Sequence, residues 1–407
     1  MTGAAQTTRD GSDGPRPGQV LGPAEVGPVA HGGHCVVRCE GLVVFTRGAL
    51  PGELVTLRVT EVRSKYARGE VVEVHRASPQ RRTPPCPVAD RCGGCDFQHV
   101  TAPGSRELKA AVVAELLANA GIDHAPMVEA VEPEEFGWRT RMRYHRGHDG
   151  RVGLLAHRSG EVVALPAQGC LIAAEAIAGP LPPGPEGRSE GAVGGLDPST
   201  GAGIGVADVL GVAADSGVLL GRREDLPATV TERVGGRAFE VATTGFWQSH
   251  ARAPEVLVGA VLEALAPQPG ERAFDLYCGV GLFAAALADA GCRVWGVEGE
   301  RIAVALARRN VRGARFTAGD VADVLRRLPS RTELVVLDPP RAGAGRRVME
   351  AVAARQPRAI AYVACDPAAL ARDLATAAGL GYRTVSVRAF DLYPLTHHVE
   401  CVALLQR

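Results

Sequence analysis

The sequence predicts an α/β protein in which a small β-barrel and a cysteine-rich segment precede a parallel sheet wrapped by helices. Short apolar runs separated by turn residues fill the chain from about residue 19 to residue 74. Three cysteines follow within ten residues, and from about residue 241 strand-like and helix-like segments alternate. A chain of 407 residues has room for two or three domains of ordinary size.

The composition excludes several classes of protein. Charged residues make up 22% of the chain and hydrophobic residues 46%, and 45 basic residues balance 45 acidic ones, so the net charge does not indicate a nucleic-acid partner. Two of the longest stretches without a charged residue, 162–174 and 276–288, have 13 residues each, whereas a bilayer-spanning helix needs ~18 or more. The N-terminus has no apolar core of a secretory signal. We expect a cytoplasmic monomer that does not contact membranes.

The N-terminal region divides into a disordered tail and a barrel. Residues 1–17 are polar and rich in Gly and Thr, and we expect them to be disordered. In 18–78 the run LVTLRVTEV alternates apolar and polar positions, the period of a strand, and ALPGE supplies a turn. This pattern predicts a β-barrel of the OB type, a fold that often binds oligonucleotides.

The central region, 79–240, combines a helix, several strands and a long loop. The run 105–120 predicts a helix that is N-capped by Ser105 and ended by Gly121. Strands are expected in 137–170, and 179–205 is dense in Gly and Pro and predicts a loop or linker. Six arginines against the single acid Asp149 form an arginine island that could follow a phosphate backbone or simply be a solvated face: Arg139, Arg141, Arg143, Arg146, Arg151 and Arg158.

The cysteines of the central region indicate a metal site. Cys86, Cys92 and Cys95 are closely spaced, and Cys170 is the nearest later cysteine. Without a signal peptide, metal-binding or catalytic roles are favoured over disulfides. Four thiolates suit either zinc or an iron–sulfur cluster. Five other cysteines are expected to be packing residues: Cys35, Cys39, Cys278, Cys292 and Cys401.

The C-terminal region, 241–407, reads as a βαβ series with a nucleoside site at one end. Asp275-Leu-Tyr-Cys-Gly279-Val-Gly281 follows a strand and opens a helix, so that the backbone can approach a ligand closely. Glu298 ends the next strand, where a carboxylate can accept both ribose hydroxyls of a nucleoside. YRTVSVRAF and VECVALLQ are expected to add two strands at one edge of the sheet.

Two further residues predict chemistry at the same end of the sheet. Cys365 follows the fifth strand above the ligand crevice, and Asp366-Pro367 opens a helix whose N-terminus can lower the pKa of a thiol. Glu400 lies within an apolar edge strand and is expected to be half-buried, as a tuned base would be. The alternatives are a buried packing cysteine and an ordinary surface carboxylate.

Several motifs follow one another in an order that is typical of one family: Gln248, DLYCGVGLF, GVE, LDPPRAG, YVACDP and FDLYPLTHHVE. In these motifs the chain resembles the uracil-5 RNA methyltransferases. In the spacing Cys86-x5-Cys92-Gly-Gly-Cys95 with Cys170, it resembles the branch with a TRAM barrel and a [4Fe–4S] cluster. The resemblance implies a TRAM domain over 18–78, a central domain with the cluster on these four cysteines, and a Rossmann-like methyltransferase domain over 241–407.

The resemblance also implies roles for individual residues. Cys365 would be the nucleophile and Glu400 the base. Four residues would contact S-adenosylmethionine, with Asp320 near the adenine: Gln248, Tyr277, Glu298 and Asp338. His250 stands where members often have Asn, and Leu282 where they often have a small polar residue. Arg341, after Asp338-Pro-Pro, is not the aromatic residue of amino-group methyltransferases.

The chemistry of uracil requires the same three parts. Addition of a thiolate at C6 makes C5 nucleophilic, C5 takes the methyl group, and a base then removes the C5 proton. The sequence therefore predicts an RNA uridine C5-methyltransferase that acts on 23S rRNA, with the tRNA T-loop as the alternative. A C-methyltransferase of small aromatic metabolites and a catalytically silent RNA-binding protein are the other classes, and the barrel with the arginine island and the intact Cys365 and Glu400 argue against them.

Overall fold

The computed structural model describes residues 15–39, 41–147, 149–179 and 209–407. The expected disorder of 1–17 and the expected loop over 179–205 therefore fall almost entirely outside the described residues. The chain divides into two compact units, residues 1–82 and 83–407. Each unit is described by itself.

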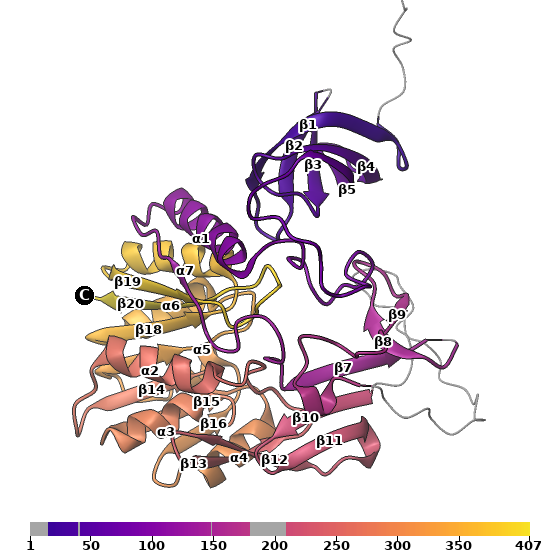
Figure 1. Cartoon of the computed structure of the whole chain (residues 1–407). Coiled ribbons are helices and arrows are strands. Elements are labelled where there is room, and N and C mark those ends of the chain that lie inside the picture. Colours follow the sequence, from indigo (N-terminus) through magenta and orange to yellow (C-terminus); the bar gives the residue numbers. More distant parts are fainter. Residues whose placement is uncertain (1–14, 40, 148, 180–208) are drawn as a thin grey trace, which may run out of the picture. The chain divides into compact units, whose positions relative to one another are not determined.

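The first unit is a closed barrel of five strands, as the sequence predicts (Figure 1). The strands close in the order β1-β2-β3-β5-β4, with β3 and β5 parallel. Alternation in β4 buries Val55, Leu57 and Val59, because successive side chains of a strand point to opposite faces. The strands are β1 Val20–Val29, β2 Cys35–Cys39, β3 Leu42–Arg47, β4 Leu54–Val62 and β5 Ala67–Arg76.

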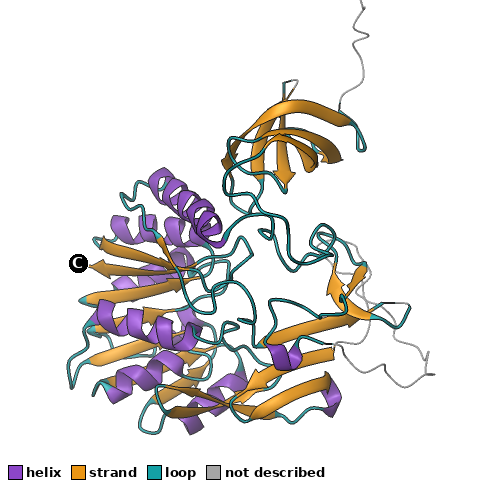
Figure 2. Cartoon of the chain, in the orientation of Figure 1, coloured by secondary structure: helices purple, strands orange, loops and turns teal. Residues whose placement is uncertain are grey.

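The second unit is built on an eight-stranded sheet with helices on both faces (Figure 2). The sheet order is β16-β15-β14-β17-β18-β20-β19-β6. Neighbours from β16 to β18 are parallel, and β20 is antiparallel to β18 and β19. The strands are β6 Val128–Glu129, β14 Arg272–Leu276, β15 Arg293–Glu298, β16 Arg315–Ala318, β17 Leu334–Leu337, β18 Ala359–Ala364, β19 Arg383–Phe390 and β20 Glu400–Gln406.

Two apolar cores cover the two faces of this sheet. In β17, Leu334 and Val336 join the core beneath α2, α3 and α4, whereas Val335 and Leu337 join the core beneath α1, α5, α6 and α7. A strand buried on both faces reads as a continuous apolar run, which is why LVVL carries no alternation. The helices are α1 Ala102–Asn119, α2 Ala253–Leu265, α3 Leu282–Asp289, α4 Arg301–Asn310, α5 Val321–Leu325, α6 Gly345–Ala353 and α7 Pro367–Gly379.

The two closing strands confirm the expected antiparallel pair but correct the position of Glu400. Its strand, β20, is the inner member of the pair and lies between β18 and β19. Glu400 is therefore 3% exposed instead of half-buried on an edge strand. The apolar neighbours of Glu400 in sequence could not show on which side of β20 the strand β19 would pair.

Helix α1 begins earlier than expected. Its N-cap is Thr101, whose Oγ1 accepts from the backbone N of Gly104 at 3.3 Å, whereas Ser105 lies buried in the first turn. Pro103 suits the first turn of a helix, where its missing N–H is no loss. Farther along α1, Lys109 is 2% exposed and its Nζ lies 2.6 Å from Asp391 Oδ1. Removing one partner of such a buried pair typically costs about 3–5 kcal/mol.

A smaller five-stranded sheet, with order β11-β10-β7-β8-β9, confirms the strands expected in 137–170. Its members are β7 Arg141–Arg146, β8 Val152–Leu155, β9 Val162–Ala164, β10 Val209–Ala214 and β11 Gly217–Arg222. Short 3-10 turns at Glu175–Ile177 and Arg223–Asp225 and a two-stranded ribbon, β12 Thr229–Val234 with β13 Arg237–Ala242, complete this part. Among the described residues, no helix combines the length and apolarity needed to cross a bilayer.

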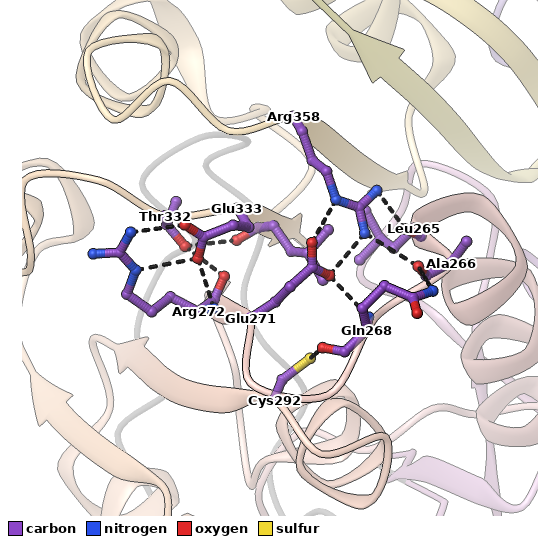
Figure 3. Close-up of polar contacts among 10 residues, drawn as sticks. Leu265, Ala266, Gln268, Glu271, Arg272, Cys292, Thr332, Glu333 and Arg358 are labelled. Carbon is purple, nitrogen blue, oxygen red and sulfur yellow. Dashed lines mark hydrogen bonds and ion pairs between the residues drawn. The ribbon is translucent and has the colours of Figure 1, made fainter.

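Ion pairs tie the amino ends of the central strands together (Figure 3). Arg272, which begins β14, donates through Nη2 to Glu333 Oε1 at 2.7 Å, just before β17. Arg358, just before β18, donates to both carboxylate oxygens of Glu271 at 2.6 and 2.7 Å. These contacts fix the end of the sheet opposite to the end where a doubly wound fold binds its ligands.

Candidate active site

A cavity of about 940 Å³ lies at the carboxyl ends of the parallel strands. It is lined by every residue that the sequence assigns to catalysis or to the cofactor: Cys365, Glu400, Gln248, Tyr277, Glu298, Asp338 and Asp320. These residues come from segments between positions 248 and 400, and the sheet brings their strand ends to one edge. The structure therefore assembles the two predicted sites into one.

The loop after β14 forms one wall of the cavity. Tyr277, Gly279 and Gly281 all have positive φ, of 64°, 52° and 94°, so the chain turns sharply and α3 begins directly after Gly281. A Cβ at Gly281 would lie 3.0 Å from Val311 Cγ2, so the backbone approaches α4 at a distance that favours glycine. Asp275 Oδ2 accepts from the backbone N of Ala284 at 2.8 Å and thereby holds the first turn of α3.

Glu298 is oriented by backbone groups on two sides. Its Oε2 accepts from the backbone N of Gly279 at 3.1 Å, and its Oε1 accepts from the backbone N of Glu300 at 2.9 Å. Each carboxylate oxygen has a further acceptor site, so the pair can still receive two hydroxyl protons from a ribose. The glycine loop and the acidic strand end thus form a single preorganised element.

Asp338 directly follows β17 and lines the same cavity as Glu298, Cys365 and Glu400. Burial and the neighbouring Glu298 raise its pKa to about 7. Burial also raises the pKa of Asp275 to about 8, even though the carboxylate accepts from Ala284. Of these two carboxyl groups, Asp338 lines the cavity, and a cationic ligand there would favour its ionised form.

Cys365 and Glu400 are neighbours across two strands. Ala364 pairs with Cys401 at the end of the antiparallel register of β18 and β20, and the next residues outward on the two strands are Cys365 and Glu400, which both line the cavity. Burial raises the pKa of the Cys365 thiol to about 12, and the nearby Glu400 adds to the shift. Burial and Asp338 raise the pKa of Glu400 well above its ordinary value.

Arg341 is a positively charged side chain that influences both members of this pair. It lowers the pKa of Cys365 and of Glu400 against the larger effect of burial. Its Nη2 lies 3.1 Å from His398 Nε2, and burial lowers the pKa of His398 to about 3, so the neutral ring accepts this hydrogen bond. Asp366 Oδ1 accepts from the backbone N of Ala369 at 2.9 Å and caps α7 directly after Cys365.

Several cavity residues received no role from the sequence, and four of them are large side chains with a distinctive position. Tyr393 and His398 belong to the quoted motif FDLYPLTHHVE, and their position between β19 and β20 is the feature that could have marked them. Phe246 and Ile302 line the cavity although they are 73% and 61% exposed. Large apolar side chains that face solvent beside a cavity are typical of surfaces that a ligand covers.

The two departures from the family pattern differ in position. Leu282 begins α3 and lines the cavity. His250 is 1% exposed beside the cavity, with its ring stacked on Trp138 at a centroid distance of 5.9 Å. Its Nδ1 accepts from the backbone N of Arg252 at 3.1 Å. His250 therefore fills a packing position in this chain.

The arginine island combines structural and exposed members. Arg141 is half-buried, donates to Glu232 Oε1 at 3.0 Å and supports the carbonyl of Thr243. Arg139 lines the cavity, and Arg151 pairs with Asp149 at 2.6 Å in an exposed position. The island is therefore divided between a buried ion pair, a cavity wall and a solvated face.

The cysteine-rich segment is compact. None of the ten cysteines, all of which lie among the described residues, forms a disulfide. Cys92, Cys95 and Cys170 lie close enough to influence one another's charge, and Gln98 hydrogen-bonds the Cys95 side chain while its Oε1 accepts from the backbone N of Cys86 at 3.1 Å. Over the ranges that the structure describes, no three His, Cys, Asp or Glu side chains are arranged as ligands of a metal ion.

Known proteins resemble this chain over nearly its whole length. The TRAM domain family matches residues 18–72, and the family described as tRNA (Uracil-5-)-methyltransferase matches residues 228–407. A protein of Streptomyces avermitilis described as an uncharacterized RNA methyltransferase is 43% identical over 94% of this chain and 97% of its own. The 23S rRNA (uracil(1939)-C(5))-methyltransferase RlmD of Shewanella sp. (strain ANA-3) is 32% identical over 92% of this chain and 93% of its own.

A solved structure shares the fold. The tRNA (uracil-54, C5)-methyltransferase of Pyrococcus abyssi, in complex with S-adenosyl-L-homocysteine, superimposes with a TM-score of 0.69 and 23% identity. The match covers 94% of this chain and 99% of the other.

Proposed function

Because this chain belongs to the RNA (uracil-5-)-methyltransferase family, we propose that it transfers a methyl group from S-adenosylmethionine to C5 of one uridine in 23S rRNA. The observation that carries the proposal is that Cys365 and Glu400, next to each other at the ends of β18 and β20, line the cavity that also contains the Glu298 loop. A thiol, a carboxyl group and a nucleoside-binding wall are the three parts that methylation of uracil C5 requires.

The cofactor fits the wall formed by the loop after β14. S-Adenosylmethionine supplies an electrophilic methyl group on a sulfonium centre. We assign the ribose hydroxyls to Glu298, whose two oxygens are already aimed by Gly279 and Glu300. Tyr277, Gln248 and Asp338 would complete the contacts, with Asp320 beside the adenine. The carboxyl groups of this wall favour a cationic ligand, in agreement with the sulfonium charge.

The reaction follows from the positions of the two facing residues. The Cys365 thiolate adds to C6 of the uracil, and the electron pair of the C5–C6 bond moves into an enolate. C5 then forms a bond to the methyl carbon while the bond from that carbon to sulfur breaks. Glu400 removes the C5 proton, the electron pair re-forms the double bond, and the thiolate leaves. A base directly opposite the thiol in register suits this last step.

The thiol requires activation before it can attack. The pKa of Cys365 at about 12 means that the free enzyme holds a protonated thiol at neutral pH. Arg341 favours the thiolate, and the helix N-terminus after Asp366 acts in the same direction. A paired base is shielded inside a stem, so the target uridine has to be single-stranded or flipped out of the stack to reach Cys365.

We propose 23S rRNA as the substrate because relatives that are 31–32% identical over 92% of this chain carry that function in their names. The tRNA alternative is favoured by the description of the matching family and by the function of the solved structure. The barrel and the exposed part of the arginine island would supply RNA contacts outside the cavity.

We also propose a structural [4Fe–4S] cluster on Cys86, Cys92, Cys95 and Cys170. Four thiols are donors that suit a cluster, and Cys92, Cys95 and Cys170 are near enough to affect one another's pKa, while Gln98 contacts both Cys95 and Cys86. The described side chains are not arranged as metal ligands, so the proposal rests on the donor set and on the family resemblance. Four thiolates would also suit zinc. The methyl transfer moves no electron to or from a metal, so the cluster would shape this segment and would not take part in the chemistry.

The deciding experiment maps 5-methyluridine in total RNA from a strain that lacks this gene. We expect one modified site of 23S rRNA to be lost and to return when the gene is restored. Loss of a tRNA site would favour the alternative substrate. A map without a lost site in either RNA would overturn the proposed function.

A further inference from the structure

We propose that Tyr393 is a positioning residue for Glu400: its hydroxyl donates to the Glu400 carboxylate and directs that carboxylate toward the proton on uracil C5. The inference rests on the proposed function, because it concerns the last step of that reaction. Tyr393 lines the same cavity as Cys365 and Glu400, and its hydroxyl is near enough to Glu400 to favour the ionised form of that carboxyl group.

The ring of Tyr393 is fixed by two aromatic neighbours. Its centroid lies 6.1 Å from that of Trp138 and 5.8 Å from that of His398, and both contacts are edge-on, with interplanar angles of 88° and 73°. Trp138 is 1% exposed, so one of these neighbours belongs to a packed core. A ring held on two sides has few rotamers, and its hydroxyl therefore has a defined direction.

The backbone of Tyr393 is anchored by a buried cation. Its carbonyl oxygen accepts from Lys109 Nζ at 3.0 Å, and the same Nζ pairs with Asp391 Oδ1 at 2.6 Å. Thr396 Oγ1 also donates to this carbonyl, at 2.7 Å. Helix α1, through Lys109, thus holds the loop between β19 and β20 at Tyr393.

The electrostatics of Glu400 give this hydrogen bond a function. Asp338 opposes ionisation of Glu400, whereas Arg341 and the Tyr393 hydroxyl favour it. A buried carboxylate needs a donor for its charge, because burial removes the water that would otherwise supply one. Tyr393 offers a neutral donor at one carboxylate oxygen, which leaves the other oxygen for the C5 proton. Its effect is expected in the proton-abstraction step, after methyl transfer.

The test compares Tyr393→Phe with wild-type full-length protein in single turnovers on the RNA that carries the target uridine. Radiolabelled S-adenosylmethionine reports methyl transfer, and denaturing electrophoresis reports the covalent protein–RNA adduct. We expect methyl transfer within about twofold of wild type and decay of the methylated adduct slowed roughly 10- to 100-fold, the loss typical of a hydrogen bond to a charged group. Binding of S-adenosylmethionine should be unchanged.

Tyr382→Phe is the matched control. The Tyr382 hydroxyl donates to the backbone oxygen of Pro357 at 3.0 Å, the side chain is 2% exposed, and it does not line the cavity. This variant loses a buried tyrosyl hydrogen bond without approaching Glu400, so the adduct should decay at the wild-type rate. Its melting temperature shows how much stability a folded protein loses when one buried tyrosyl hydrogen bond is removed.

Two outcomes overturn the inference. One is a folded Tyr393→Phe protein whose methylated adduct decays at the wild-type rate. The other is a folded variant that binds RNA and S-adenosylmethionine but forms no adduct, because Tyr393 would then act before the base. Failure of the proposed function is recognised separately, since the wild-type protein would then form no adduct and methylate no uridine.

Discussion

The Asp96 carboxylate accepts from the backbone N of His397 at 3.0 Å and lies 2.6 Å from His397 Nδ1, although 301 positions separate the two residues. The backbone N atoms of Asp96 and Phe97 both donate to the Leu395 carbonyl at 2.9 Å. Asp96 directly follows Cys95, so these contacts join the cysteine-rich segment to the loop that ends at Glu400. Burial opposes ionisation of Asp96, but the hydrogen bonds and charge of His397 bring its pKa down to about 2.

The Asp96–His397 contact is expected to support activity without contributing to the cofactor site. Asp96→Ala should lower the stability of this unit by about 1.5–3 kcal/mol, the range for a hydrogen bond to a charged group, and slow methylation. Affinity for S-adenosylmethionine should be retained, because the residues assigned to the cofactor belong to other segments of the chain. Thermal melting, calorimetric binding and methylation rates measure the three effects. An Asp96→Ala protein with wild-type stability and a wild-type methylation rate would contradict a supporting role for this contact.

Substitutions of Cys365 and of Glu400 should stop the reaction at different steps. Cys365→Ala is expected to form no covalent adduct and transfer no methyl group. Glu400→Gln should add the thiol and transfer the methyl group, then stall as a methylated adduct that survives denaturing electrophoresis. Loss of a general base typically costs ~100- to 10,000-fold, so the adduct should be visible within one turnover. Normal turnover by folded Glu400→Gln would remove Glu400 from the mechanism.

The free enzyme should protect Cys365 from alkylation at neutral pH. With a pKa of about 12 instead of 9.0, the thiol forms about 1,000-fold less thiolate than an ordinary cysteine. Labelling with iodoacetamide, read by mass spectrometry, should rise steeply with pH, and Arg341→Met should slow it further because Arg341 lowers this pKa. The partly exposed Cys39 serves as internal reference. Equal labelling of the two thiols at pH 7 would contradict the protonated state of Cys365.

The ion pair at the amino end of the sheet should stabilise the fold in a pH-dependent way. Hydrogen bonds from Arg272 bring the pKa of Glu333 down to about 2 from its ordinary 4.5. The stabilisation is therefore fully present above pH 4.5 and is lost as the pH falls toward 2. The pair is about one-third exposed and screened by solvent, so Glu333→Gln should cost about 1 kcal/mol at pH 7.

Urea unfolding at pH 7 and pH 3 measures this difference. The gap between wild type and Glu333→Gln should narrow at the lower pH. Arg346→Gln is a suitable control, because its pair with Glu350 is a more exposed contact along α6 and should contribute a few tenths of a kcal/mol. A gap of equal size at both pH values would argue against the ion pair as its source.

The proposed cluster predicts a coloured protein. Anaerobically purified chain should be brown, absorb broadly near ~400 nm and hold about four irons per molecule. Cys92→Ala should lose the colour, whereas Cys39→Ala, outside the four-cysteine set, should keep it. Colourless wild-type protein with stoichiometric zinc would contradict the cluster and indicate a zinc site instead.

Several features of the fold follow from local sequence patterns. Alternation in LVTLRVTEV showed a barrel strand, and the apolar runs before Asp275 and Cys365 showed parallel strands whose ends carry the loop and the thiol. These predictions hold because side-chain period, turn chemistry and the side of a strand end are properties of a few consecutive residues. The motifs before Glu298, Asp338 and Cys365 could therefore be assigned to one edge of the sheet.

The surroundings of Glu400 depend on long-range packing that no local pattern predicts. Pairing of β19 outside β20 turned an expected edge residue into a buried one, and capping by Thr101 moved the start of α1. Lys109, more than 280 positions earlier in the chain, holds the backbone of Tyr393, which lines the same cavity as Glu400. Such contacts join segments whose separation along the chain exceeds any local pattern. Burial and direction of a side chain are set by whichever distant element packs against it.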